Sequence, residues 1–265
     1  MSDVILQANN LVKIYTQRSG RFGFSSTQVK ALDDVSIALK TGSTLAVVGE
    51  SGSGKSTLAR CLLQLHPFDS GEVFFQGQDL ARLEGQSLRE VRKHLQMVFQ
   101  DPFASLNPRM KVSEIVGEGL LIHKLGSVEE QKEKVHQMLE RVGLEVTDAQ
   151  KYPHQFSGGQ RQRIGIARAL VLAPKVVVCD EPVSALDVSV QAQILLLLKE
   201  LQREMNLSYI FISHDLRVVR HIADEMVVMN QGRIVEQGKV ADIYNAPQQP
   251  YTQQLLNAIP GRKAA

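Results

Sequence analysis

The residues with the clearest chemical meaning form one continuous stretch: Gly49, Glu50, Ser51, Gly52, Ser53, Gly54, Lys55, Ser56 and Thr57. Their order and spacing match the phosphate-binding pattern G-x-x-x-x-G-K-[ST]. The glycines allow a tight backbone loop whose N–H groups point inward and can cradle phosphate oxygens. Within such a loop Lys55 can reach the β- and γ-phosphates of a nucleotide as a point charge, and the Ser56 hydroxyl can ligate Mg²⁺.

The residues on either side of this loop have the patterns of a strand and a helix. An apolar run over residues 43–48 ends at the loop, and Leu58, Cys61, Leu62 and Leu65 follow it at helical spacing. The N-terminus of that helix would add its partial positive charge to the attraction for an anion. A Gly/Ser linker has a similar composition but lacks these flanks. We therefore expect the chain to bind a nucleoside triphosphate.

Two further strand ends carry ionisable side chains. A buried strand predicted at 175–179 runs into Asp180 and Glu181. In enzymes with this kind of loop, an acid at such a strand end holds Mg²⁺ through water, and Glu181 can accept the proton of an attacking water. The alternative is a pair of solvated turn carboxylates. A strand at 207–212 ends at a Ser-His-Asp sequence. Because a hydrolase triad is assembled from distant positions rather than from neighbours, we expect His214 to contact a γ-phosphate instead.

Gln100 and Tyr15 have two interpretations each. Gln100 follows a strand predicted at 95–99 and precedes a proline break, so it can reach a site at the sheet edge or simply cap a turn. Tyr15 lies upstream of the phosphate loop. Its ring can stack on a nucleotide base, although a structural strand tyrosine is the more common case.

A second anion-binding helix terminus opens at Ser157, Gly158, Gly159 and Gln160, where a serine cap and two glycines precede an apolar helical pattern. One γ-phosphate cannot readily use both this terminus and the phosphate loop of the same chain, because a helical segment stands between them. We hypothesise that two chains face each other. The Ser157 loop of one chain would then close over the phosphates held by the other, so that ATP holds the dimer together.

The elements that must position these groups alternate in type. Strands are expected at 4–15 and 29–40, joined by a polar loop or long hairpin connection at 17–28. Other strands are expected at 71–75, 225–230 and 233–237, and helices at 87–93, 112–122, 128–142 and 189–204. No strand pattern occurs between 103 and 156, which predicts a helical subdomain inserted into an α/β core.

Bulk composition excludes several classes of protein. Thirty basic residues face 28 acidic ones, which leaves no electrostatic footprint for nucleic acid. No apolar run approaches the ~20 residues of a membrane span, and the N-terminus lacks a secretory signal, so we expect the chain to be made and kept in the cytosol. The two cysteines, Cys61 and Cys179, lie in apolar segments and are predicted to be buried thiols rather than a disulfide or metal site.

Together the segments GESGSGKST, MVFQDP, FSGGQRQR, VVVCDEP, SALD and SHD, in this order, resemble the ATP-binding subunit of an ABC transporter. The resemblance covers nearly the whole chain. It implies a P-loop NTPase core with an N-terminal antiparallel β-subdomain and an inserted α-helical signature subdomain. The implied domains are 1–102 with 157–245 as the ATPase core, 103–156 as the helical insert, and 246–265 as a C-terminal extension.

The resemblance also implies a role for each candidate residue. Tyr15 would stack on adenine, and Gln100 would sense both Mg²⁺ and the membrane subunit. Ser157 to Gln160 would be the signature loop that acts across a dimer. Of the remaining residues, Asp180 would serve Mg²⁺, Glu181 would be the catalytic base, Asp187 would link the two sites and His214 would contact the γ-phosphate. No catalytic position departs from the pattern, so the chain is expected to hydrolyse ATP.

A narrower likeness rests on Gln100 to Arg109, Tyr152 to Gln155 and Pro247 to Thr252, which resemble peptide/nickel importers. Those importers pair two different ATPase subunits with two membrane permeases and an external solute-binding protein. This chain resembles the second ATPase type, which implies a heterodimer with the first type; a homodimer is the alternative. The resemblance implies a peripheral position on the cytoplasmic face of the inner membrane. The solute could be a dipeptide, an oligopeptide, glutathione or nickel.

Two other classes of protein also contain a phosphate loop of this kind. One is a soluble ABC-type ATPase that acts on nucleic acid or ribosomes. The near-neutral charge, the single ATPase domain and the lack of a long coiled coil or zinc-ligand insert argue against it. The other is a switch protein that signals by its nucleotide state, and such a protein does not need the Ser157 loop.

Overall fold

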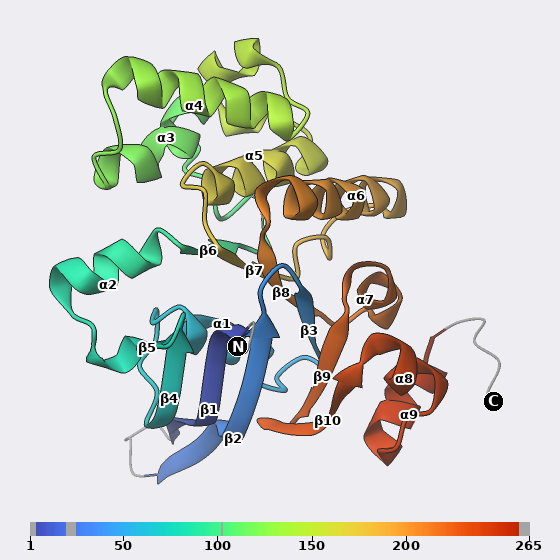
Figure 1. Ribbon diagram of the computed structural model, residues 1–265. Helices are drawn as coiled ribbons and strands as arrows, with labels where there is room; N and C mark the ends of the chain where they lie inside the picture. Colours follow the sequence, from blue (N-terminus) through green and yellow to red (C-terminus); the bar gives the residue numbers. More distant parts are fainter. Residues whose placement is uncertain (1–3, 20–24, 102, 260–265) are drawn as a thin grey trace. The chain divides into compact units, whose positions relative to one another are not determined.

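The computed structural model describes residues 4–19, 25–101 and 103–259 (Figure 1). Its contacts divide the chain into two compact units. The first unit is Met1–Glu84 with Tyr209–Ala265, and the second is Gly85–Ser208. The predicted division into core, helical insert and C-terminal extension stays a prediction.

An antiparallel sheet forms one layer of the first unit, with the strand order β2-β1-β4-β5. Its strands are β1 (Val4–Ser19), β2 (Ser25–Lys40), β4 (Ser70–Phe75) and β5 (Gln78–Asp79). Along β2, Val35, Ile37 and Leu39 are buried and alternate with exposed residues, as the period of a half-buried strand requires. The N-terminal antiparallel subdomain is therefore confirmed.

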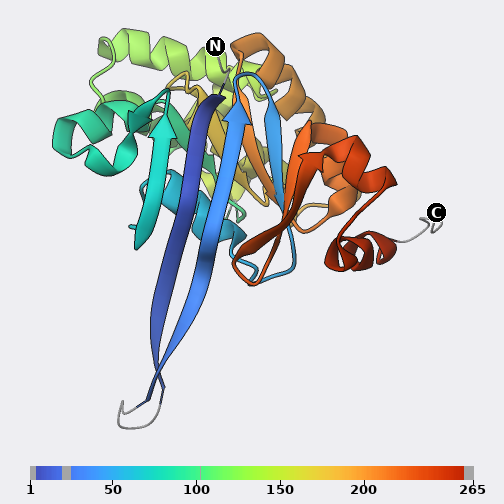
Figure 2. The ribbon, with the colours of Figure 1, turned by 60° about the horizontal axis from the view of Figure 1, so that its bottom comes forward.

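The polar segment at 17–28 is largely strand. Tyr15 pairs with Val29, and the ladder continues to Ser19 opposite Ser25, so β1 and β2 form a long hairpin that projects past the other strands of its sheet (Figure 2). Of the two predicted alternatives, the hairpin connection is correct and the open loop is wrong. The turn itself, at 20–24, lies outside the described residues.

The other sheet strands of the first unit surround β3 (Thr44–Val48), which is buried along its whole length. It pairs in parallel with β8 (Ser208–Ser213) on one side and β9 (Glu225–Asn230) on the other. β10 (Arg233–Lys239) pairs antiparallel with β9 through a turn at Gln231 and Gly232. Both turn residues have positive φ, as a two-residue hairpin turn with right-handed twist needs.

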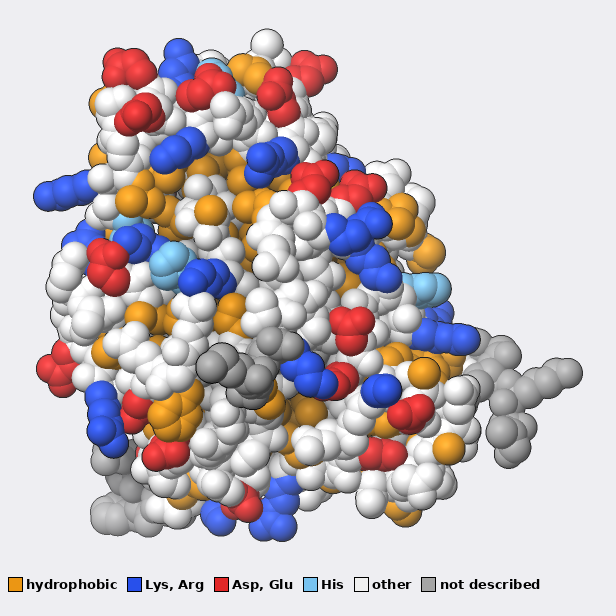
Figure 3. All heavy atoms as spheres, in the orientation of Figure 1, with side chains coloured by type: hydrophobic (Ala, Val, Ile, Leu, Met, Phe, Trp, Pro, Cys, Tyr) orange, Lys and Arg blue, Asp and Glu red, His pale blue; other side chains and the backbone are white. Residues whose placement is uncertain are grey.

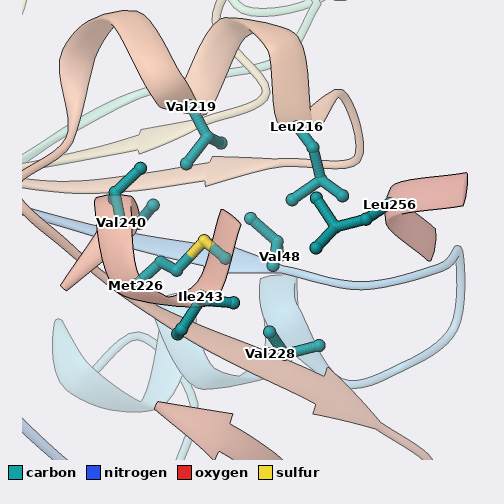
Figure 4. Packing of buried hydrophobic residues seen from close by; sticks show 9 residues of the cluster. Val48, Leu216, Val219, Met226, Val228, Val240, Ile243 and Leu256 are labelled. Carbon is teal, nitrogen blue, oxygen red and sulfur yellow. The ribbon is translucent and has the colours of Figure 1, made fainter. Parts of the chain in front are cut away.

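Short helices complete the first unit. They are α1 (Lys55–Leu62), the 3₁₀ turn η1 (Leu80–Arg82), α7 (Leu216–Ile222), α8 (Val240–Asn245) and α9 (Pro250–Asn257). Helices α7, α8 and α9 place their apolar side chains on β3 and β9. Figure 4 shows this cluster, in which Leu216 and Leu256 lie against Val48, and Val240 lies beside Met226. Each fully buried aliphatic side chain of this kind contributes roughly 1.5–3 kcal/mol of transfer free energy.

The second unit is mostly helical. Its helices are α2 (Gly85–Arg92), α3 (Val112–Ile122), α4 (Val128–Arg141), α5 (Gly158–Leu170) and α6 (Val188–Met205), with 3₁₀ turns η2 (Val146–Gln150) and η3 (Pro153–Gln155). In this unit, strands β6 (Leu95–Val98) and β7 (Val176–Asp180) pair in parallel. Over α3 and α4, Figure 3 shows basic and acidic side chains interspersed, with no continuous patch of either sign on that face.

Helix α4 illustrates how the sequence sets its own boundaries. The Ser127 hydroxyl accepts a hydrogen bond from the Glu130 N–H, and the Glu130 carboxylate accepts one from the Ser127 N–H at 2.6 Å. This reciprocal cap satisfies two N–H groups that a helix terminus otherwise leaves unpaired. Val135, Met138 and Leu139 are buried on one face, as their spacing predicts.

The strands and helices predicted from the sequence are confirmed, with their ends shifted by a few residues. Helix α7 is an addition to the predicted set, because its seven residues are too few to show a clear apolar period. None of the helices that the structure describes is long and apolar enough to cross a membrane.

Candidate functional site

The phosphate loop connects the end of β3 to the start of α1, as predicted. Gly49 and Gly54 have φ of 150° and 106°. A Cβ at Gly49 would lie 2.2 Å from the Met229 carbonyl oxygen, and one at Gly54 would lie 2.3 Å from the carbonyl oxygen of Ala31. Only glycine fits both the left-handed backbone and this close approach. The loop is therefore held tightly against its neighbours.

Lys55 lies across the loop that precedes it. Its side chain is buried, and Nζ donates hydrogen bonds to the carbonyl oxygens of Gly49 at 2.8 Å and Glu50 at 2.7 Å. Within the described part of the chain, the buried hydroxyl of Ser53 has no hydrogen-bond partner. A buried cation, an unsatisfied hydroxyl and a helix N-terminus in one loop form a donor set that suits phosphate oxygens. The residues present thus fit the triphosphate of a nucleotide.

Tyr15 is fixed from two directions. Its hydroxyl shares a hydrogen bond of 3.1 Å with Nδ1 of His66, and Nζ of Lys13 lies 5.4 Å from the ring centroid. Lys13 in turn lies 3.6 Å from the Asp69 carboxylate. The half-buried ring is therefore held in place, which suits a stacking platform as well as a structural tyrosine, so its adenine-stacking role stays a prediction.

His214 follows β8 and is exposed. The neighbouring Asp215 does not serve a hydrolase triad, because its carboxylate caps α7 through the Arg217 N–H and binds the Arg217 guanidinium at 2.7 Å. The same guanidinium lowers the pKa of Asp215 below its usual range. The sequence argument against a triad is thereby supported.

The second unit brings two predicted residues into direct contact. Gln100 follows β6 and Glu181 follows β7, and Nε2 of Gln100 donates to Oε2 of Glu181 at 3.0 Å. These strands are parallel and in register from Leu95 to Val98, so their carboxyl ends meet at one edge. Asp180 is buried at that same edge. The interpretation of Asp180 and Glu181 as two solvated turn carboxylates does not describe this arrangement.

Glu181 also has an unusual backbone. Its φ is 46°, a left-handed conformation that is uncommon for a residue with a side chain. The N–H and hydroxyl of Ser184 both bind the Glu181 carbonyl oxygen, at 3.2 and 3.1 Å, and hold the turn. Such conformations cost about 1–3 kcal/mol and cluster at active sites. The turn thereby aims the Glu181 side chain.

The Ser157 loop is a capped helix terminus, as predicted. The Ser157 hydroxyl accepts from the Gln160 N–H, and Oε1 of Gln160 accepts from the Ser157 N–H at 3.0 Å. A Cβ at Gly159 would lie 2.5 Å from Cγ1 of Val190, so this terminus packs closely on the start of α6. Asp187 caps α6 through the Val190 N–H and accepts a hydrogen bond from the Ser189 hydroxyl, which lowers the pKa of Asp187.

The sequence of the chain also matches a known protein family. A family model described as ABC transporter matches residues 32–184, more than half of the chain. The chain belongs to the ABC transporter family. Its recognition by sequence motifs is confirmed, and so are ATP binding and membership of the ABC ATPases.

Individual ABC proteins are similar over nearly the full chain. The oligopeptide transport ATP-binding protein AppF of Bacillus subtilis is 51% identical, with 97% of this chain and 79% of the relative covered. The dipeptide transport ATP-binding protein DppF of Escherichia coli is 54% identical, with 97% and 76% covered. The dimeric, post-hydrolysis structure of the ATP-binding cassette MJ0796 with ADP and Pi has a TM-score of 0.78 at 30% identity, with 89% of this chain and 99% of that chain covered.

In this ABC ATPase the predicted site residues divide between the two units. The first unit holds Tyr15, the phosphate loop from Gly49 to Thr57, and His214; the second holds Gln100, Ser157 to Gln160, Asp180, Glu181 and Asp187. Within the second unit, the contact between Gln100 and Glu181 and the packing of the Ser157 loop on α6 are established. The catalytic and binding roles of the individual residues stay predictions.

The sequence of this ABC chain did not reveal the roles of His66 and Tyr251, or one property of Ser53. Ser53 was named only as part of the phosphate loop, and its buried, unsatisfied hydroxyl was not foreseen. His66, which binds Tyr15, has no motif that would single it out. Tyr251 contacts the phosphate loop by accepting a hydrogen bond from the Glu50 N–H. It lies in the Pro247 to Thr252 run, so a signal was present, but nothing in that run indicated its partner.

Proposed function

We propose that this ABC ATPase energises the import of peptides across the cytoplasmic membrane. The observation that carries the proposal is 54% identity, over 97% of the chain, to a protein named for dipeptide transport. A second relative, named for oligopeptide transport, supports the same class of solute. Nickel and glutathione are the alternatives within the subfamily that the motifs resemble.

The side chains divide the work of hydrolysis. Lys55 and the N–H groups of its loop bind the phosphates, and the Tyr15 ring receives the adenine. Ser56, Gln100 and Asp180 would hold Mg²⁺, which supplies positive charge against the phosphate oxygens. Glu181 accepts the proton of the attacking water. Gln100 donates a hydrogen bond to that carboxylate at 3.0 Å, and so orients the base.

The remaining residues act between subunits in this proposal. The capped terminus at Ser157 to Gln160 closes over the phosphates of a second ATPase subunit, and Asp187, at the start of the helix on which this terminus packs, links the two sites. His214 contacts the γ-phosphate. The helical insert at 103–156 moves on closure, and Gln100 transmits that movement to the permeases.

The proposed assembly is peripheral on the cytoplasmic face of the inner membrane. It contains two membrane permeases and a second, non-identical ATPase, and an extracytoplasmic protein delivers the solute. The mixed surface charge over α3 and α4 gives no support to the alternative function, an ABC-type ATPase that acts on nucleic acid or ribosomes (Figure 3).

A tagged pull-down from detergent-solubilised native membranes, read by mass spectrometry, tests the assembly. We expect two multi-span permeases and a second ATPase. Recovery with ribosomal or DNA-repair proteins would overturn transport and leave the ATPase site intact. Uptake of a labelled dipeptide by cells that carry Glu181→Gln in place of the native chain tests the solute. Loss of dipeptide uptake with unchanged nickel and glutathione uptake supports peptides, and the opposite pattern rejects them.

A further inference from the structure

The C-terminal run from Pro247 to Thr252 has no part in the proposed hydrolysis, yet the structure anchors it firmly. Helix α9 starts at Pro250, where the missing N–H of proline is not needed. Its residues Thr252 and Leu256 are buried, and Leu256 belongs to the same cluster as Val48 (Figure 4). Val48 is the last residue of β3 and directly precedes the phosphate loop. Helix α9 therefore packs on the strand end from which the loop departs.

One polar contact joins this helix to the loop. The hydroxyl of Tyr251 accepts a hydrogen bond of 3.2 Å from the backbone N–H of Glu50. That N–H belongs to the peptide group between Gly49 and Glu50. The carbonyl oxygen of the same peptide group accepts a hydrogen bond of 2.8 Å from Nζ of Lys55. A single planar peptide is thus bound at its donor by Tyr251 and at its acceptor by Lys55.

The two bonds act on a rigid body. The C=O and N–H of a trans peptide point in opposite directions and cannot rotate independently, because the C–N bond has partial double-bond character. Any rotation that releases the N–H from Tyr251 also swings the carbonyl oxygen away from Lys55. The Lys55 ammonium has a second acceptor in the Glu50 carbonyl oxygen at 2.7 Å, one residue along. The position of the phosphate-binding lysine is thereby coupled to the Tyr251 hydroxyl.

Packing alone does not require this hydroxyl. The Tyr251 ring is partly buried against the apolar cluster of Val48 and Leu256, and a phenylalanine would cover the same surface. Among the residues that the structure describes, the contact that the hydroxyl adds is the one with the loop. Burial raises the pKa of Tyr251 above its ordinary value, so the group stays an uncharged hydroxyl at neutral pH.

We propose that Tyr251 is a positioning residue for the phosphate loop, through which helix α9 fixes the Gly49–Glu50 peptide and, with it, Lys55. The proposal rests on the role of Lys55 in nucleotide binding. It gives the C-terminal run a function in ATP affinity rather than in chemistry. The Tyr251 hydroxyl contacts the backbone of the phosphate loop, so the effect of its removal should fall on ATP binding.

The chain supplies a matched control in Tyr244. Its partly buried ring packs on the same apolar cluster, and its hydroxyl donates a hydrogen bond to the Leu216 carbonyl oxygen. Tyr244→Phe therefore removes one hydrogen-bonded hydroxyl from the same core, but none that binds the phosphate loop. Tyr251→Phe and Tyr244→Phe can be compared in the purified full-length protein.

Three measurements test the proposal: equilibrium binding of ATP, deuterium exchange of the peptide that covers residues 49–55, and the kcat at saturating ATP. Because one hydrogen bond contributes about 0.5–1.5 kcal/mol net, Tyr251→Phe is expected to raise the Kd for ATP about 2- to 10-fold. Exchange in that peptide should become faster, and the kcat at saturating ATP should stay unchanged. Tyr244→Phe should leave the Kd and the exchange at their wild-type values.

Other outcomes reject the proposal. An unchanged Kd in Tyr251→Phe, or equal losses of affinity in both variants, means that the hydroxyl does not position the loop. A fall in kcat at an unchanged Kd also contradicts it. Lys55→Ala tests the role of the lysine separately from the role of Tyr251. If Lys55→Ala still binds ATP with wild-type affinity, the assumed role of the lysine is wrong; if it loses ATP while Tyr251→Phe does not, only the role of Tyr251 is wrong.

Discussion

Replacement of Glu181 by glutamine removes the proposed base and almost nothing else. The amide has the size of the carboxylate, and its oxygen can still accept the hydrogen bond that Gln100 donates at 3.0 Å. The bonds from Ser184 go to the Glu181 backbone carbonyl, so the turn at φ 46° keeps its support. Because the side chain is only partly buried, we expect the free energy of unfolding to change by about 0.5 kcal/mol or less.

The expected loss lies in the chemical step. A positioned general base accelerates proton transfer by about 10²–10⁴-fold, which corresponds to roughly 3–5 kcal/mol in the activation free energy. Glu181→Gln should therefore lower kcat for ATP hydrolysis by that factor and leave the Kd for ATP unchanged. Since ATP then persists in the site, an ATP-held dimer should accumulate.

Phosphate release under saturating ATP, equilibrium ATP binding and gel filtration with and without ATP measure these three quantities. The matched control is Glu200→Gln, which replaces an exposed carboxylate on α6 and should match the wild type in each. Wild-type turnover in Glu181→Gln would refute the assignment of the base. A loss of ATP binding equal to the loss of turnover would show that the carboxylate serves binding instead.

Lys55→Ala should lose nucleotide binding, because it removes the buried ammonium of the phosphate loop, and unchanged affinity in a titration with ATP would contradict this role. Tyr15→Ala should weaken ATP binding by about 1–3 kcal/mol if the ring stacks on adenine. An unaltered Kd would instead support the interpretation of Tyr15 as a structural residue of its strand. Burial raises the pKa of both thiols, that of Cys61 to about 11, so the native protein should not react with a thiol reagent at pH 8. The raised pKa stabilises the fold below the ordinary thiol pKa of about 8.5, and this contribution should decline as the pH rises from there toward 11, which urea unfolding at several pH values would measure.

The elements that the sequence predicts well are those whose signal is local. The phosphate loop joins an apolar run to a helical pattern, and the part of β2 from Val35 to Leu39 alternates, so both appear in the structure where they are expected. Helix α4 carries its own cap at Ser127. The polar segment at 17–28 is less readable, because two polar strands that pair with each other in a hairpin lack the apolar alternation of a half-buried strand.

The site was predictable as separate residues but not as pairs. The sequence places Gln100 and Glu181 each at a strand end, yet it contains no sign that β6 and β7 are neighbours. Only that pairing brings the amide to the carboxylate. The left-handed backbone of Glu181 is likewise invisible in a residue type that seldom adopts it. The sequence identifies candidate groups, and tertiary pairing decides which of them touch.

The contact of Tyr251 with the phosphate loop is also a tertiary pairing that the sequence does not show. The hydrogen bond between Tyr251 and Glu50 spans 201 residues, so no periodicity or motif spacing can reveal it. The short tail run still marks the position, because a proline-initiated helix with a buried Leu256 must pack on some part of the core. Packing on the cluster that contains Val48 places the ring beside the strand end, and the Glu50 N–H of the adjacent loop donates a hydrogen bond to its hydroxyl. A hydroxyl at that position gives the loop N–H an acceptor that a phenylalanine would lack, which is why tyrosine rather than phenylalanine suits the site.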